Sequence, residues 1–153
     1  MSTPAKAFPV KPIPEGYHTV TPYLVVQGAG KLIDFMKAAF GAQEMFRMPM
    51  PDGSIGHAEM RIGNSMIMIG EARDQWKAMP TALYLYLEGV DAAYASALAA
   101  GATAISEPKN QFYGDRQGAV QDMCGNSWWI ATHIEDVSEE EMKRRMDAAA
   151  GGH

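Results

Sequence analysis

The sequence lacks the features that would support an internal disulfide, a nucleic-acid partner or a membrane span. It has one cysteine, Cys124, so no disulfide can form within the chain, and we expect a cytoplasmic location. The formal net charge of -5 provides no basic field for nucleic acid. The N-terminus lacks the pattern of a secretory signal, and the apolar runs are far shorter than the roughly 20 residues that cross a bilayer. We therefore expect neither a nucleic-acid nor a membrane partner.

What the chain does contain is an internal repeat. Residues 56–71, GHAEMRIGNSMIMIGE, return as residues 118–133, GAVQDMCGNSWWIATH, with an identical Gly-Asn-Ser at the centre of each copy. Upstream, Phe40-Gly41-Ala42 has a counterpart in Ala100-Gly101-Ala102. A hydrophobic content of 47% over 153 residues is sufficient for a sizeable core. The repeat predicts two similar modules.

Each copy is predicted to form a strand, a helix and three further strands. Leu32, Ile33, Met36 and Phe40 recur at helical spacing and precede Gly41, a residue suited to ending a helix. In the second copy, leucines alternate with Tyr84 and Tyr86, which predicts a strand with the leucines beneath the helix and the tyrosines on the opposite face. The predicted organisation is as follows: a proline-rich N-terminal arm (1–17), a first βαβββ module (18–71), a linker (72–80), a second βαβββ module (81–135), and a C-terminal helix and tail (136–153).

These motifs resemble the vicinal oxygen chelate superfamily, which includes glyoxalase I, bleomycin-resistance proteins and extradiol dioxygenases. The runs that resemble its PhnB-like branch are Thr21-Pro22-Tyr23-Leu24, Ile33-Asp34-Phe35, Gly63-Asn64-Ser65 and the segment from Trp129 to Val137. The resemblance implies an α+β fold in which tandem βαβββ modules form curved mixed sheets around a cavity. It also implies a homodimer, as is common among family members.

The metal-dependent members draw four ligands from the first and last strands of the two modules. The resemblance places these positions at Thr21, Met68, Ala82 and Trp129, none of which is a usual metal ligand. We therefore expect no cofactor.

A divalent metal at a shifted site is the alternative, with His57, Glu59 and His133 as its ligands. Against it, His57, Glu59 and Arg61 fit the polar face of a strand whose Ala58 and Met60 pack inward. His133 equally fits a strand-end histidine bonded to the backbone.

Soft and aromatic side chains take the place of metal ligands in the predicted cavity. Met and aromatic groups stabilise planar or cationic molecules, although they could also fill the space as a closed core. The segment 110–116 is predicted to be a lid or a specificity loop, and its Arg116 could grip a carboxylate or phosphate or pair with Asp115 or Asp122. The predicted ligand-binding residues are Thr21, Tyr23, Met66, Met68, Tyr84, Tyr86, Phe112, Tyr113, Arg116 and Trp129.

Three functions are compatible with this pattern. The favoured one is a glyoxalase/bleomycin-resistance-like protein that binds a small aromatic or amphipathic molecule in a metal-free cavity. The second is a metal-dependent isomerase, lyase or dioxygenase that uses the shifted site. The third is an interaction module with a closed cavity. No catalytic residue can be assigned, because no nucleophile–base pair is evident and Cys124 has no neighbour that would activate it.

Overall fold

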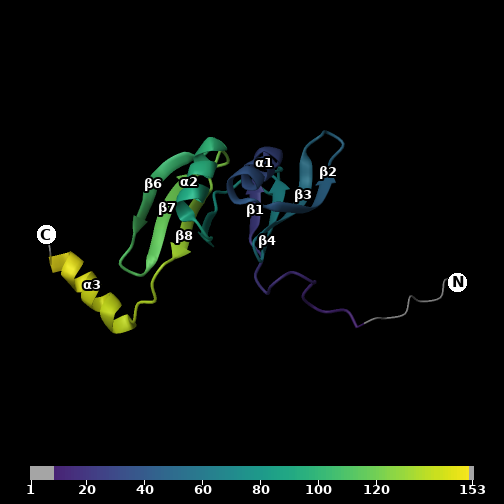
Figure 1. Ribbon diagram of the computed structural model, residues 1–153. Helices are drawn as coiled ribbons and strands as arrows, with labels where there is room; N and C mark the ends of the chain where they lie inside the picture. Colours follow the sequence, from purple (N-terminus) through teal and green to yellow (C-terminus); the bar gives the residue numbers. More distant parts are fainter. Residues whose placement is uncertain (1–8, 152–153) are drawn as a thin grey trace.

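The computed structural model describes residues 9–151. The first residues of the predicted arm, 1–8, and the last two of the tail, 152–153, lie outside that range. The chain forms two four-stranded mixed sheets, with strand orders β1-β4-β3-β2 and β5-β8-β7-β6. In each sheet the first and last strands of the module are parallel neighbours, and the other pairs are antiparallel. The predicted α+β fold of two βαβββ modules is confirmed, and Figure 1 shows the modules side by side.

The first module contains five elements before the linker, and its strands are joined by short turns. Its elements are β1 (Tyr23–Val26), α1 (Ala29–Phe40), β2 (Gln43–Pro49), β3 (Ile55–Ile62) and β4 (Ser65–Glu71). Strand β1 begins directly after Pro22, which has no N–H to donate to a neighbouring strand. Helix α1 ends at Gly41, where φ is 65°, a conformation that glycine adopts without a Cβ penalty.

The second module repeats the order, and a third helix follows it. Its elements are β5 (Ala82–Tyr86), α2 (Val90–Ala99), β6 (Thr103–Asn110), β7 (Asp115–Gln121) and β8 (Ser127–His133), followed by α3 (Glu139–Gly151). In β5, Leu83 and Leu85 pack against the core while Tyr84 and Tyr86 are exposed, as the alternation predicts.

Helix α3 stands apart from both sheets. The Ser138 hydroxyl accepts a hydrogen bond from the Glu141 N–H at 3.2 Å and caps its first turn. None of its residues is buried, and Figure 1 shows it extending away from the second module. Arg145 attaches it to the body through Glu135 at 2.8 Å and the Phe112 carbonyl at 3.0 Å. No helix in residues 9–151 is long and apolar enough to cross a membrane.

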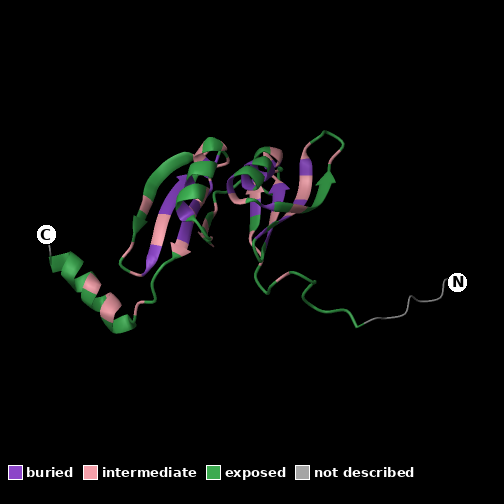
Figure 2. Cartoon of the chain, in the orientation of Figure 1, coloured by how far each residue is buried: buried purple, intermediate pink, exposed green. Residues whose placement is uncertain are grey.

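One core joins the two modules. Trp128, on β8, is fully buried, and its ring lies 5.0 Å from that of Phe40 and 6.5 Å from that of Phe35, both on α1. Its indole N–H donates to buried Asp122 at 2.7 Å. Figure 2 shows the buried residues on the strands and helices of the two modules, whereas residues 9–22 and helix α3 contain none. The two modules therefore pack as one body.

Replacing Trp128 tests this shared core. Trp128→Ala should lower the free energy of unfolding by about 3–5 kcal/mol, because it removes a fully buried ring that both modules contact. Trp76→Ala is the matched control, since Trp76 is 68% exposed and its loss should change stability by only about 0.5 kcal/mol. Urea unfolding measures both. Similar losses for the two variants would contradict a core centred on Trp128.

Candidate functional site

The first open face is the side of the first sheet that α1 does not cover. Side chains on it include Tyr23, His57, Glu59 and Met68, from three adjacent strands. The His57 ring lies 5.8 Å from that of Tyr23 and 6.3 Å from that of Phe46. The Tyr17 hydroxyl donates a hydrogen bond to Glu59. This face therefore combines aromatic rings with polar groups.

The linker forms one wall of an open cavity on the first open face. Both ends of the segment 72–79 bond to β1, through Ala72 N–H to the Val26 carbonyl at 2.8 Å and Met79 N–H to the Val25 carbonyl at 3.2 Å. The cavity has a volume of about 1010 Å³, at the upper end of the range for small-molecule sites. Its lining comprises Tyr23, Val25, Met48, Gly56, His57, Gly70, Glu71, Arg73, Asp74, Gln75, Trp76 and Met79.

The second open face is the side of the second sheet opposite α2, and it is built around Asp115. This carboxylate is only 2% exposed and accepts hydrogen bonds from the hydroxyls of Tyr84 at 2.6 Å and Tyr86 at 2.9 Å. His133 Nδ1 lies 2.8 Å from its other oxygen, and His133 Nε2 lies 2.8 Å from Asp136. The two tyrosine rings are 5.2 Å apart. This cluster presents two phenol rings and a partly exposed imidazole to solvent.

Hydrogen bonding sets the pKa values of the Asp115 cluster. Burial tends to raise the pKa of Asp115, but hydrogen bonds from Tyr84, His133 and Tyr86 outweigh it and hold the pKa below its usual value. Desolvation and the bond to Asp115 raise the pKa of Tyr84. The bonds to Asp115 and then Asp136 raise the pKa of His133. These hydrogen bonds therefore stabilise the ionised form of Asp115, the neutral forms of Tyr84 and Tyr86 and the charged form of His133.

The backbone around Gly114 fixes the position of Asp115. Gly114 has a φ of 96°, and a Cβ there would overlap the Glu135 carbonyl oxygen. Its own carbonyl accepts N–H groups from Ile134 at 2.8 Å and Glu135 at 3.1 Å. Only glycine permits this close approach, which locks the start of β7 against the segment after β8. Asp115 and His133 are held together as a result.

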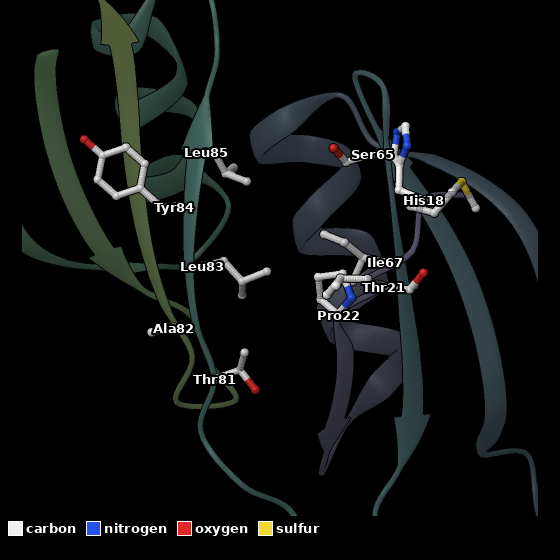
Figure 3. A pocket seen from close by; sticks show the side chains of 12 residues that line it. His18, Thr21, Pro22, Ser65, Ile67, Thr81, Ala82, Leu83, Tyr84 and Leu85 are labelled. Atoms are coloured by element: carbon white, nitrogen blue, oxygen red, sulfur yellow. The ribbon is translucent and has the colours of Figure 1, made fainter. Parts of the chain in front are cut away.

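A second cavity of about 400 Å³ lies in the seam between the modules. Leu83 and Leu85 project from β5 toward Ile67 across this seam, while Tyr84 points to the other side of β5 (Figure 3). Its lining comprises His18, Val20, Thr21, Pro22, Ser65, Met66, Ile67, Thr81, Ala82, Leu83, Tyr84 and Leu85. The seam is thus mainly apolar and separate from the cavity on the first open face.

Residues 17–130 match the family model for the glyoxalase/bleomycin resistance protein/dioxygenase superfamily. The chain belongs to this superfamily. The protein Rv0887c of Mycobacterium tuberculosis is 34% identical over 144 residues, which cover 87% of this chain and 85% of that protein. The superfamily resemblance is therefore confirmed.

Several solved structures share the fold at low sequence identity. TioX from Micromonospora sp. ML1 has a TM-score of 0.62 and 20% identity, covering 75% of this chain and 99% of that one. A mutant of the fosfomycin resistance protein FosX from Listeria monocytogenes, complexed with Mn(II) and 1S,2S-dihydroxypropylphosphonic acid, has a TM-score of 0.57 and 20% identity. That match covers 82% of this chain and 94% of FosX. Identities this low establish the fold alone.

The four inherited ligand positions of the superfamily do not fit a divalent metal here. Thr21 and Ala82 line the seam cavity, while Met68 and Trp129 lie on different open faces. A hydroxyl, a methyl, a thioether and an indole cannot replace the hydration of such an ion. Within residues 9–151, no three His, Cys, Asp or Glu side chains form a group that could hold a metal.

The shifted metal set is divided between the modules. His57 and Glu59 share the first open face, whereas His133 bonds to Asp115 on the second. The chain therefore does not bring these three side chains together by itself.

The predicted ligand-binding residues occupy several places rather than one cavity. Tyr23 and Met68 are Cα partners on the first open face, and Tyr84 and Trp129 are partners on the second, beside Tyr86. Thr21 and Met66 line the seam. Phe112 and Tyr113 lie in the turn between β6 and β7, with ring centroids 5.2 Å apart.

Arg116 lies on the helix-covered side of its sheet. Its guanidinium bonds to Asp91 of α2 at 2.9 Å through two nitrogens and to Asn110 at 3.1 Å. Neither of the partners predicted for it, Asp115 and Asp122, is used. Alternation along β7 turns Arg116 away from Tyr84 and Tyr86, and its role in ligand binding stays a prediction.

Three site residues were missed in the sequence. Asp115 was considered only as a partner for Arg116, and Arg73 and Trp76 were assigned to an irregular linker. The sequence signal for Asp115 is that it directly follows Gly114 at the start of a strand. The backbone conformation of this glycine therefore also constrains the position of Asp115. Arg73 and Trp76 carry no comparable signal, because nothing local shows that the linker folds back over the sheet.

Cys124 is not a nucleophile in this arrangement. Burial, followed by the charges of Asp122 and Glu71, raises the pKa of its thiol to about 11. Its sulfur lies 3.3 Å from the Gln27 carbonyl oxygen of the first module. Cys124 therefore helps to hold the two modules together.

Asp115→Asn tests the charge arrangement of the second open face. Because Asp115 is the largest cause of the raised pKa of His133, the variant should shift that pKa down toward the ordinary value of about 6.5. NMR titration of the imidazole signals measures it. Asp136→Asn is the control and should lower the pKa less, since Asp136 is the second cause. An unchanged His133 pKa in Asp115→Asn would contradict the geometry.

The same shifts fix the direction of the pH dependence of stability. The raised pKa of His133 means that its charge stabilises the fold fully below about pH 6.5, and this contribution is lost as pH rises through the folded-state value. The lowered pKa of Asp115 acts in the opposite sense, with stability lost as pH falls through its folded-state value.

Proposed function

We propose that this protein binds a small aromatic or amphipathic molecule in a metal-free cavity. The observation that carries the proposal is the cavity of about 1010 Å³ on the first open face, with aromatic and thioether groups in its walls. Flat rings and polarizable sulfurs stabilise planar ligands by about 0.5–1.5 kcal/mol per contact. Several such contacts around one ligand support affinity in the micromolar range. We further infer a PhnB-like protein of the cytoplasm, which the run Trp129–Val137 and the single cysteine support.

The metal-free character rests on the chemistry of the side chains. The superfamily positions Thr21, Met68, Ala82 and Trp129 offer at most one hydroxyl oxygen and one thioether sulfur, which are poor ligands for the ions that metal-dependent relatives use. A metal-dependent isomerase, lyase or dioxygenase would need the shifted set, and His133 of that set is already engaged by two aspartates.

The binding experiment uses isothermal titration calorimetry with 2-naphthol, indole and N-methylquinolinium. At least one compound should bind, and Trp76→Ala should weaken that binding about 2- to 10-fold, since it removes one stacking surface from the cavity wall. Met146→Ala is the control, because Met146 is exposed on α3 and lies outside the cavity. Bound ligand should also raise the unfolding temperature.

Two results would overturn the proposed function. Absence of binding by all three compounds would favour a closed interaction module. Stoichiometric nickel, zinc, iron or manganese in protein purified without chelator, lost in His57→Ala or Glu59→Ala, would instead favour the metal-dependent enzyme.

We also propose that the protein is a homodimer. Large aromatic side chains on both open faces are exposed, with Tyr23 at 49% and Tyr86 at 63%. Exposed apolar patches of this kind mark interaction surfaces, and a two-fold dimer lets each chain bury the same surfaces on its partner.

Light scattering after size-exclusion chromatography tests the dimer. The measured mass should be twice the 16.6 kDa of the chain. Tyr86→Glu should shift the protein toward the monomer, because it places a charge in the interface, whereas Tyr94→Phe on α2 should not. A monomeric wild-type protein at high concentration would exclude this proposal.

A further inference from the structure

The cavity on the first open face has a floor made of two glycines. Gly56, on β3, is the extra residue at an irregularity in the pairing with β2, where Met48 faces His57 and Pro49 faces Ile55. Gly70 lies beside it on β4, because a Cβ built at Gly70 would lie 3.4 Å from the Gly56 carbonyl oxygen. The two residues leave adjacent gaps in the surface of the sheet.

Two hydrogen-bond donors occupy these gaps. A Cβ at Gly70 would lie 2.7 Å from the Tyr23 hydroxyl oxygen, and a Cβ at Gly56 would lie 2.8 Å from Arg73 Nη2 and 2.7 Å from the Met50 sulfur. Any larger residue at either position would displace the donor above it. The absence of side chains at Gly56 and Gly70 thus allows a phenol hydroxyl and a guanidinium to approach the sheet side by side.

Arg73 is held in this place by the backbone of the linker. Its N–H donates to the Trp76 carbonyl at 2.8 Å, and the Trp76 N–H donates back to the Arg73 carbonyl at 3.0 Å. The ends of the linker are fixed to β1, so the turn that carries Arg73 and Trp76 is positioned before any ligand arrives. Trp76 provides an aromatic wall beside the guanidinium.

The guanidinium of Arg73 is available to a ligand. The ion pairs formed within residues 9–151 do not include it. Two carboxylates also line the cavity, but both oxygens of Glu71 accept N–H groups at the start of α1, from Gly28 at 2.9 Å and Ala29 at 3.0 Å. Asp74 is the remaining acidic group of the lining.

We propose that this cavity selects planar aromatic carboxylates, with Arg73 and Tyr23 binding the carboxylate over the glycine floor and Trp76 contacting the ring. The inference rests on the proposed function and adds the charge of the ligand. A guanidinium presents parallel N–H donors that match the two oxygens of a carboxylate, and the phenol adds a third donor. Neither donor is provided by the superfamily's metal-ligand positions.

The experiment compares three ligands of one shape: 2-naphthoate, the neutral 2-naphthamide and the cationic 2-naphthylmethylammonium. Calorimetry on the full chain should show 2-naphthoate binding about tenfold more tightly than 2-naphthamide, the gain of a charge-assisted pair. The ammonium compound should bind most weakly. Arg73→Gln should bring 2-naphthoate to within about twofold of 2-naphthamide, because it removes the charge that distinguishes the two ligands.

Two further variants separate recognition from folding. Arg47→Gln removes an exposed arginine that pairs with Glu44 on β2 outside the cavity, and it should leave the preference intact. Tyr23→Phe keeps the ring and removes the hydroxyl, so it should weaken the binding of 2-naphthoate about threefold.

The outcomes distinguish this inference from the proposed function. Equal affinity of the wild-type protein for 2-naphthoate and 2-naphthamide, or tighter binding of the ammonium compound, would overturn the carboxylate preference and leave the proposed function standing. An equal loss of the preference for 2-naphthoate in Arg47→Gln and in Arg73→Gln would also overturn the carboxylate preference and leave the proposed function standing. Absence of binding by all three ligands would overturn both.

Discussion

The packing of Trp128 against α1 is the interaction on which the arrangement of the whole chain depends. A tryptophan from the second module is buried against Phe35 and Phe40 of the first, and its only polar atom is satisfied by Asp122. The same aspartate accepts N–H groups from Cys124 at 2.8 Å and Asn126 at 3.0 Å, which fixes the turn before β8. Packing between modules and local turn geometry are thus linked through one carboxylate.

This shared core determines where the functional surfaces lie. Because the helices and the inner sides of both sheets are used to join the modules, the opposite sides of the sheets are left open. Each open face then acquires its own chemistry: a guanidinium, a phenol and a tryptophan around a glycine floor on the first, and a buried aspartate with two tyrosines and a histidine on the second. A duplicated fold has therefore produced two different surfaces.

The repeated Gly-Asn-Ser turn shows how identical residues take different roles. In the first copy Asn64 is exposed and accepts only from the neighbouring Ser65 hydroxyl, at 3.0 Å. In the second copy Asn126 is fully buried, and its side-chain oxygen accepts the Thr81 N–H at 3.0 Å, which ties the linker to the turn. The local sequence is the same, so the difference comes from what the surrounding chain packs against each turn.

The order of the elements, their faces and the family could all be predicted from local patterns in the chain. Alternation in β5, helical spacing before Gly41 and the repeated turn each act over a few residues, so they can be recognised without tertiary structure. The same rule predicts on which face of the sheet each side chain lies. Arg116 lies on the face opposite to the expected one, because a shift of one residue along a strand reverses the face.

Which side chains meet could not be predicted in this way. The approach of Arg73 to Gly56 depends on the linker folding back onto β1, and the contact of Asp115 with Tyr84 and His133 depends on three strands aligning in register. These contacts join residues that are distant in the chain, and their energies come from the packing of the whole body. Local propensity contains no information about them, which is why the sequence predicted aromatic surfaces, whereas only the tertiary structure decided which polar side chains lie beside them.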